Sequence, residues 1–306
     1  MRRFVRQCAL FSTLCLALLL TIEIPVQINY SNRTHWQDDW AEMASSYRDV
    51  LLIGNSRAWT GFDAPHLSDC TAKNCYTVAL DGWNAQFLIE KCKYHLKNQQ
   101  PPTHIVVQLD PSMTFERLGW HGKNKLLKHL FLDRLNTFSF SSTLEGHRNL
   151  DFFLPGFRYF GNHKAYFRDI SISVEKPDRK NAYDSLRLGF NPYFAKKGPL
   201  SPSPKHTIWN ETQTNRMFKR IDALTSLFPN AQVLFIYPPT SEALHQLSPI
   251  EPFKLYAKSQ KRPFLDMSNQ FEDSKMYDHT HCSNLVTDII ADSLCLWINT
   301  NSEALQ

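Results

Sequence analysis

The stretch DVLLIGNSRAWTGFD, from Asp49 to Asp63, decides the fold class of this chain. It opens with a continuous apolar run, Val50 to Gly54, of the kind found in parallel strands that are buried on both faces. The run ends abruptly in Gly-Asn-Ser, and a polar segment with an arginine follows. Two interpretations of Ser56 are open. It supplies ordinary turn chemistry, or it is a nucleophile held where the strand passes into a helix.

Further apolar runs alternate with helical patterns along the rest of the chain. The predicted strands are Cys75–Leu80, His104–Leu109, Gln232–Tyr237 and residues 263–268, and the predicted helices are residues 84–98, 210–228 and 283–299, with Asn210 as an N-cap. This alternation predicts an α/β fold in which helices cover both faces of a parallel sheet. Ligands of such sheets bind beyond the carboxyl ends of the strands. Ser56, Gly82 and Asp110 all follow strand ends, so we expect them on one edge.

The interval between the third and fourth predicted strands is too long for a single crossover. We interpret residues 111–207 as an inserted helical subdomain or lid within a domain that spans residues 48–306. The insertion is rich in aromatic and basic side chains, and Arg158 and Tyr159 are candidates for substrate binding in a sugar groove. The alternative is that these side chains pack the insertion onto the sheet.

Residues 1–29 predict a membrane anchor, and residues 30–47 a polar juxtamembrane linker. The segment MRRFVRQ is basic, and the uncharged run from Cys8 to Ile22, with its flanks, is long enough to cross about 30 Å of hydrocarbon. The three arginines predict that this end stays in the cytoplasm, with the main domain in the periplasm or outside the cell. A cleaved signal peptide is the alternative, but no small-x-small cleavage site follows the apolar run.

Composition excludes some classes of function. The chain has 306 residues, 42% of them hydrophobic, which is ample for one large domain with a core. The net charge is only +5 and no run of Lys and Arg is dense, so we expect no nucleic-acid partner.

Cysteine spacing leaves several pairings open. Two of the seven cysteines lie in the anchor. Among the other five, a Cys70–Cys75 pair would close a small loop, and a Cys282–Cys295 pair is a second option in an oxidising compartment. Five is an odd number, so at least one thiol is free or pairs between chains. There is no CxxC motif, and we assign neither a metal nor a cofactor.

A second polar cluster, YDHTH, precedes the last predicted helix. Nucleophilic acyl chemistry needs a serine, a base that takes its proton and an acid that orients the base. Asp278 and His281 would supply the acid and the base from one rigid turn. His279 is a competing base, disfavoured because adjacent side chains diverge.

The order of these blocks resembles the SGNH hydrolase superfamily of GDSL-like esterases and O-acetyltransferases. IGNSRAWTG resembles its first block, ALDGWN its second, with Gly82, and YDHTH its last. The resemblance implies a flavodoxin-like three-layer α/β/α fold with a parallel five-stranded sheet, over residues 48–110 and 208–300. It also implies a catalytic triad of Ser56, His281 and Asp278.

The third block departs from the family pattern of Gly-x-Asn-Asp. This chain has LDPSM, without the Asn that helps to hold the oxyanion. The expected oxyanion hole therefore consists of the backbone N–H groups of Ser56 and Gly82, with Asn84 or Ser112 as a further donor. We expect Arg57, which follows the nucleophile, to contact substrate.

This chain also resembles one subgroup of that superfamily, whose members have a GNSR block, an anchor and a Tyr-Pro-Pro segment. Its members work beside polytopic membrane acyltransferases on exopolysaccharide or cell-wall glycan, which implies a membrane-anchored esterase or O-acyltransferase. The alternative is a non-catalytic partner that binds glycan or recruits an acyltransferase. A secreted lipase or thioesterase fits less well, because the insertion is charged and aromatic, not uniformly apolar.

Overall fold

The computed structural model describes residues 2–31, 43, 45–79, 85–114, 190, 200 and 211–303. The chain divides into two compact units, one of residues 1–38 and 123–183 and the other of residues 39–122 and 184–306. The second unit begins ahead of position 48, and Met43, which the sequence placed in the linker, is fully buried in it. Most of the insertion expected at 111–207 lies outside the described residues.

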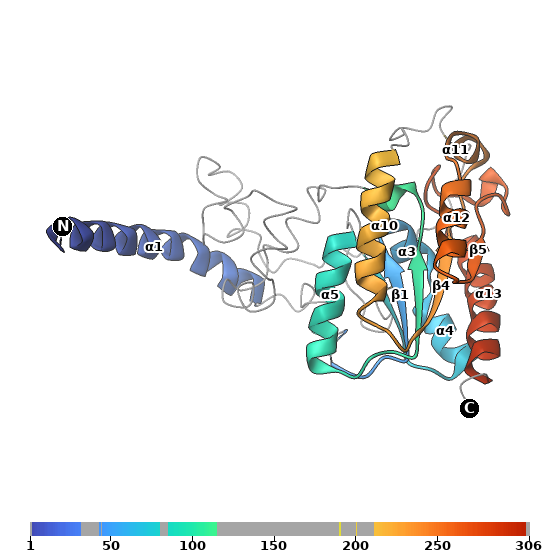
Figure 1. Ribbon diagram of the computed structural model, residues 1–306, viewed down its shortest axis with the longest axis horizontal. Coiled ribbons are helices and arrows are strands. Elements are labelled where there is room, and N and C mark those ends of the chain that lie inside the picture. Colours follow the sequence, from blue (N-terminus) through green and yellow to red (C-terminus); the bar gives the residue numbers. More distant parts are fainter. Residues whose placement is uncertain are drawn as a thin grey trace. The chain divides into compact units, whose positions relative to one another are not determined.

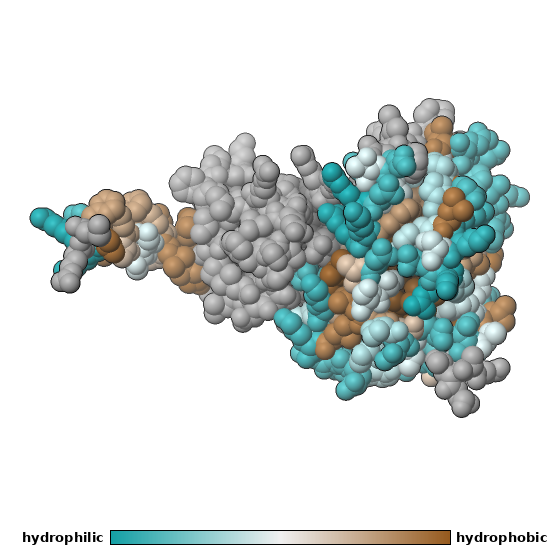
Figure 2. Space-filling view, viewed as in Figure 1, coloured by the Kyte–Doolittle hydropathy of each residue, from teal (hydrophilic) through white to brown (hydrophobic). Residues whose placement is uncertain are grey.

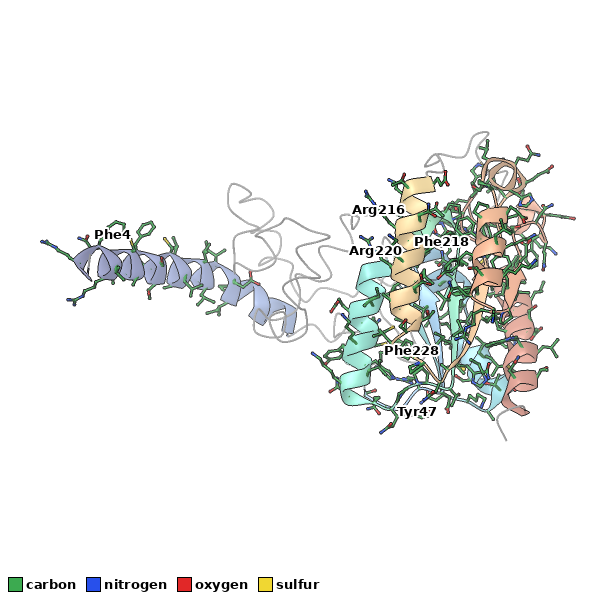
Figure 3. All side chains as sticks on the ribbon, in the orientation of Figure 1. Phe4, Tyr47, Arg216, Phe218, Arg220 and Phe228 are labelled. Carbon is green, nitrogen blue, oxygen red and sulfur yellow. A yellow bond between two sulfur atoms is a disulfide. The ribbon has the colours of Figure 1, made fainter. Side chains whose placement is uncertain are left out.

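The described part of the first unit is one helix, α1 (Arg2–Ser31), shown in blue in Figure 1. Its residues 3–25 have a mean hydropathy of 2.0, and this segment is long and apolar enough to span a membrane. A signal sequence would meet the same criteria. Apolar side chains cover most of this helix (Figure 2), and Phe4 projects from its first turn (Figure 3).

Five parallel strands form the sheet of the second unit, in the order β2-β1-β3-β4-β5. The strands are β1 (Val50–Gly54), β2 (Cys75–Ala79), β3 (His104–Gln108), β4 (Gln232–Tyr237) and β5 (Phe264–Asp266). The α/β fold with a parallel five-stranded sheet is therefore confirmed. Every residue of β1, β2 and β3 is buried, which explains why the sequences of these strands are mostly apolar.

Helices cover both faces of this sheet. One layer holds α3 (Ser56–Gly61), α4 (Ala64–Thr71) and α13 (Asn284–Glu303), and the other holds α5 (Ala85–Asn98), α10 (Glu211–Thr225) and α12 (Glu251–Ser259). Val50 and Leu52 of β1 share a buried cluster with Ile290 and Leu294 of α13. These alternate side chains point to one face of the sheet, as the period of two in a strand requires.

Aromatic rings build the core of the opposite layer. Phe218 projects from α10 toward α12 (Figure 3), and its ring stacks on Tyr256 with 4.1 Å between the centroids. Tyr256 also contacts Phe235 of β4, while Phe253 contacts Tyr237 edge-on. These contacts fix α12 over β4.

Shorter elements complete the described chain. They are the 3-10 helix η2 (Pro111–Thr114), the helix α11 (Glu242–Leu247) and the 3-10 helix η6 (Asp273–Lys275). η2 follows the carboxyl end of β3 and α11 follows that of β4, so both lie at the sheet edge where the polar residues were expected.

Candidate active site

The turn that carries Ser56 joins β1 directly to α3. Asn55 caps this helix, because its Oδ1 accepts a hydrogen bond of 3.1 Å from the backbone N–H of Arg57. Gly54 has no room for a side chain, since a Cβ there would collide with the side chain of Gln108. The Gly-Asn-Ser sequence thus lets a strand end tightly against its neighbour and presents the serine at the first position of a helix.

Gln108, the last residue of β3, holds this turn in place. Its Oε1 accepts hydrogen bonds from the backbone N–H groups of Asn55 at 3.0 Å and Ala58 at 3.2 Å. Its Nε2 lies 2.9 Å from Oδ1 of Asn55 and 2.6 Å from Oδ2 of Asp110. Sequence reasoning did not single out this residue. The signal was a polar side chain inside the apolar run HIVVQL, because a buried amide needs hydrogen-bonding partners.

The acid and the base come from a turn just before α13. The backbone N–H of Tyr277 donates to the carbonyl of His281 at 2.9 Å, which closes the turn. Oδ1 of Asp278 accepts hydrogen bonds of 2.8 Å from the backbone N–H groups of both Thr280 and His281. We call residues 277–281 the acid–base turn. Its acid is fixed by the backbone of the same turn that carries its base.

The structure brings Ser56, His281 and Asp278 into one hydrogen-bonded chain. Nε2 of His281 lies 2.8 Å from Oγ of Ser56, and Nδ1 lies 2.9 Å from Oδ2 of Asp278. Ser56 and His281 are 225 residues apart in sequence. Both distances are within the range of a nucleophile–base and a base–acid hydrogen bond. The side chain of His281 is 17% exposed, so solvent reaches the site at this histidine.

Electrostatics favour the proton arrangement that this chain of groups needs. Burial by itself would raise the pKa of Asp278, but the hydrogen bond and charge of His281, together with two backbone N–H groups, hold that pKa well below its usual range. Asp278 is therefore ionised at neutral pH. A carboxylate facing Nδ1 keeps the proton of the neutral imidazole there, so the lone pair of Nε2 faces the hydroxyl of Ser56.

The competing base, His279, faces another way. Its Nδ1 lies 2.7 Å from Oγ of Ser241, and its carbonyl accepts a hydrogen bond of 3.1 Å from the backbone N–H of Ser241. Nδ1 of His279 thus bonds Ser241, whereas Nε2 of His281 bonds Ser56.

Asp110 lies at the expected edge, but its charge is balanced. Its Oδ2 forms an ion pair of 2.9 Å with Nη1 of Arg57, and both side chains are almost fully buried. Its Oδ1 accepts hydrogen bonds from the backbone N–H of Ser112 at 2.6 Å and from the Ser112 hydroxyl at 2.5 Å. Because Asp110 is paired with Arg57, it does not present an unbalanced negative charge to an oxyanion.

The oxyanion donors expected from sequence divide into three cases. The backbone N–H of Ser56, at the first position of α3, has no hydrogen-bond acceptor among the described residues. The hydroxyl proton of Ser112 is directed to Asp110, and its oxygen lies 2.8 Å from Nδ2 of Asn55. Ser112 is thus committed within the network beneath the turn. Gly82 and Asn84 lie outside the described residues.

Arg57 does not take the position expected of a substrate contact. It is 4% exposed, and its Nη2 donates to the carbonyl oxygens of Pro238 at 2.8 Å and Pro239 at 2.6 Å. Because its guanidinium is held by these groups and by Asp110, Arg57 supports the turn from inside. The other two candidates for substrate binding, Arg158 and Tyr159, lie outside the described residues.

The disulfide in the structure joins Cys70 to Cys295, so neither pairing considered from sequence is correct. Their Cα atoms are 6.2 Å apart, within the usual range for a disulfide. Cys70 lies in the last turn of α4 and Cys295 lies on α13, and these helices pack side by side although they are distant in sequence. Cys282 follows the acid–base turn as a free thiol, and burial raises its pKa to about 12. This thiol stays protonated and does not compete as a nucleophile.

One group among the described residues has metal-ligating side chains in proximity. Ligand atoms of His66, Cys70 and Cys295 lie within 4.8 Å of one another. The two sulfur atoms are joined in the disulfide, which removes them as thiolate ligands.

Comparison with known proteins finds distant structural matches. No protein-family model and no curated protein matches the sequence of this chain. An acetyl xylan esterase from the rumen bacterium Butyrivibrio proteoclasticus is 14% identical, with a TM-score of 0.36, over 85% of this chain and 66% of that one. A protein from Streptococcus pneumonia, provisionally named a platelet activating factor, is 11% identical, with a TM-score of 0.37, over 94% and 98% of the two chains. With TM-scores below 0.5, neither bears on the chemistry of this site.

Proposed function

We propose that this protein is a membrane-anchored serine esterase or O-acyltransferase of the SGNH type, which acts on an acylated polysaccharide or cell-wall glycan outside the cytoplasm. The observation that carries the proposal is the chain of hydrogen bonds from Ser56 through His281 to Asp278, at 2.8 Å and 2.9 Å. Such a chain is what nucleophilic acyl transfer requires, and its parts come from two distant segments of sequence.

In the first half-reaction, Nε2 of His281 takes the proton of Ser56 as the hydroxyl oxygen attacks the acyl carbonyl carbon. The ionised Asp278 stabilises the imidazolium that forms. The negative charge that develops on the carbonyl oxygen is stabilised by the backbone N–H of Ser56, and the family resemblance adds that of Gly82. When the tetrahedral intermediate collapses, the bond to the leaving oxygen breaks. His281 returns its proton to that oxygen, and the acyl group remains on Ser56.

The second half-reaction decides between an esterase and a transferase. Water or a sugar hydroxyl gives its proton to Nε2 of His281 and attacks the acyl-serine, which releases Ser56 with its proton restored. Because both acceptors use the same base and the same oxyanion donors, the triad serves either outcome. The acceptor that reaches the acyl-serine determines the product.

Features outside the triad support the proposed location. The apolar α1 suits an anchor, and its basic start suits a cytoplasmic end. The disulfide between Cys70 and Cys295 suits an oxidising compartment for the domain. A glycan outside the cytoplasm is the substrate class that this location offers, and an acyl donor would have to arrive through the membrane. For that reason we include a polytopic membrane acyltransferase as a partner in the proposal.

The test is acyl release from 4-nitrophenyl acetate and from an acetylated glycan by the full-length protein in detergent. The proposal predicts that Ser56→Ala lowers kcat by at least about 10³-fold, while the thermal unfolding midpoint stays near that of the wild type. Added non-acetylated glycan should divert acetyl groups to itself if the protein is a transferase. Equal activity of wild type and Ser56→Ala would refute a catalytic Ser56, and a wild type without any activity would favour the non-catalytic partner.

A further inference from the structure

The loop between β4 and α11 contacts both halves of the candidate site. This loop, Pro238–Ser241, accepts two hydrogen bonds from Arg57, through the carbonyl oxygens of Pro238 at 2.8 Å and Pro239 at 2.6 Å. At its other end, Ser241 makes two contacts with His279, at 2.7 Å and 3.1 Å. A single short segment therefore lies between the residue that follows the nucleophile and the residue inside the acid–base turn.

The contact with Arg57 is buried and uses several groups. Arg57 is 4% exposed and its ion-pair partner, Asp110, is fully buried. The guanidinium carbon also lies 5.6 Å from the ring centroid of Tyr237, the last residue of β4. A buried Arg–Asp pair adds little net stability, because desolvation offsets its attraction, but its geometry is strongly specified. Since Arg57 follows Ser56 directly, this geometry sets where the first turn of α3 meets the loop.

The contact with His279 is equally well defined. Ser241 is fully buried and His279 is 8% exposed. Oγ of Ser241 already accepts a hydrogen bond of 3.2 Å from the backbone N–H of Leu244, as the N-cap of α11. Its one hydroxyl proton is thus free to bond Nδ1 of His279. The ring and the carbonyl of His279 both form hydrogen bonds with Ser241 of the loop. These bonds hold the acid–base turn at its central residue, between Asp278 and His281.

We infer that the Pro238–Ser241 loop braces the nucleophile turn against the acid–base turn, and that Arg57 and His279 are the two positioning residues of this brace. The inference rests on the proposed function. The Ser56–His281 hydrogen bond joins segments 225 residues apart, so its length depends on how these two turns are held. A displacement of about 1 Å at reacting groups lowers rates by up to about 100-fold.

The first experiment breaks the brace at its histidine end. The full-length protein is incubated with a fluorophosphonate probe, and the second-order rate constant for labelling Ser56 is measured for His279→Ala and Ser241→Ala. Each should lower that rate constant and kcat for 4-nitrophenyl acetate by about tenfold or more, with KM changed less than about twofold. His279→Asn keeps an acceptor where Nδ1 lies and should restore most of the rate. This rescue is not expected if His279 only fills space.

The second experiment tests the arginine end. Arg57→Lys keeps a positive charge beside Asp110 but loses the planar fork that reaches the two proline carbonyls. It should lower the labelling rate constant in the same way. The matched control is Tyr256→Phe, which removes a hydrogen bond of 2.6 Å to Asp222 between α12 and α10. The control should lower the unfolding midpoint without slowing the labelling of Ser56.

The outcomes separate this inference from the proposed function. If wild type labels on Ser56 but both His279→Ala and Ser241→Ala label at the wild-type rate while folded, the brace is refuted and the proposed function stands. The brace is also refuted if Tyr256→Phe slows labelling as much as they do. If His279→Ala does not fold, Ser241→Ala decides, because it breaks the same contact from the other side. If the folded wild type does not label at all, the proposed function fails, and the inference fails with it.

Discussion

Asp278 binds His281 at two points. Its Oδ1 accepts the backbone N–H of His281 at 2.8 Å, and its Oδ2 lies 2.9 Å from Nδ1 of the same imidazole. The acid therefore fixes the main chain and the ring of the base together. A spacing of three residues makes this possible, since the turn returns the backbone of His281 to the carboxylate.

Asp278→Asn should lower kcat for ester cleavage by about 10²- to 10⁴-fold, because an amide does not stabilise the imidazolium and favours the wrong tautomer. Kinetics on 4-nitrophenyl acetate measure the change. The control is Asp288→Asn, which alters an exposed carboxylate on α13 and should leave kcat unchanged. Similar kinetics for wild type and Asp278→Asn would contradict the role of Asp278.

Stability should depend on pH through the same carboxylate. His281 and the backbone N–H groups outweigh the effect of burial and keep the pKa of Asp278 below its unfolded value of about 3.9. Its stabilising contribution is thus present above about pH 4 and is lost as the pH falls toward the folded pKa. The difference in unfolding midpoint between wild type and Asp278→Asn should shrink from pH 6 to pH 3. A difference that stays constant or grows would contradict the paired carboxylate.

Gly54→Ala should destabilise the domain by about 1–3 kcal/mol and slow the reaction of Ser56, because the new methyl group displaces Gln108 from beneath the turn. Denaturant unfolding and esterase assays measure the two effects. Gly61→Ala, at the end of α3, is the matched variant. Its Cβ would lie 3.1 Å from Sγ of Cys282 and calls for a much smaller adjustment. Equal effects of the two substitutions would count against the close approach of Gln108.

The Cys70–Cys295 disulfide should stabilise the domain by about 2–4 kcal/mol. A reductant should lower the unfolding midpoint of wild type but not that of the Cys70→Ser, Cys295→Ser double variant. Thiol titration of unfolded, non-reduced protein gives a direct count, and the structure predicts five free thiols out of seven cysteines. A count of seven free thiols would contradict this disulfide. So would an unfolding midpoint of wild type that does not change with the reductant.

The strands of the sheet were predictable from sequence, because strands buried on both faces are mostly apolar. β1 and β4 begin and end where their apolar runs do. The three residues of the candidate triad were also predictable, since each follows a recognisable break in pattern. Their distances were not, because these depend on how β1 and the turn before α13 meet.

Other features depend on contacts between distant segments, which spacing along the chain does not reveal. Cys70 pairs with Cys295 because α4 packs on α13, whereas sequence favoured nearer partners. Arg57 follows the nucleophile and so suggested a substrate contact, but the loop after β4 lies beside it and supplies two carbonyl acceptors. Gln108 was not recognised because it ends a strand, HIVVQ, that is otherwise mostly apolar.

The most direct test of the central claim is to locate the adduct that a fluorophosphonate forms on the full-length protein. An activated serine reacts with this probe, and peptide mass spectrometry identifies the modified residue. The account predicts one adduct, on Ser56, formed at least about 10³-fold more slowly in His281→Ala, whose base is missing. An unmodified Ser56 in folded wild type, or labelling of Ser56 at the same rate in His281→Ala, would contradict it.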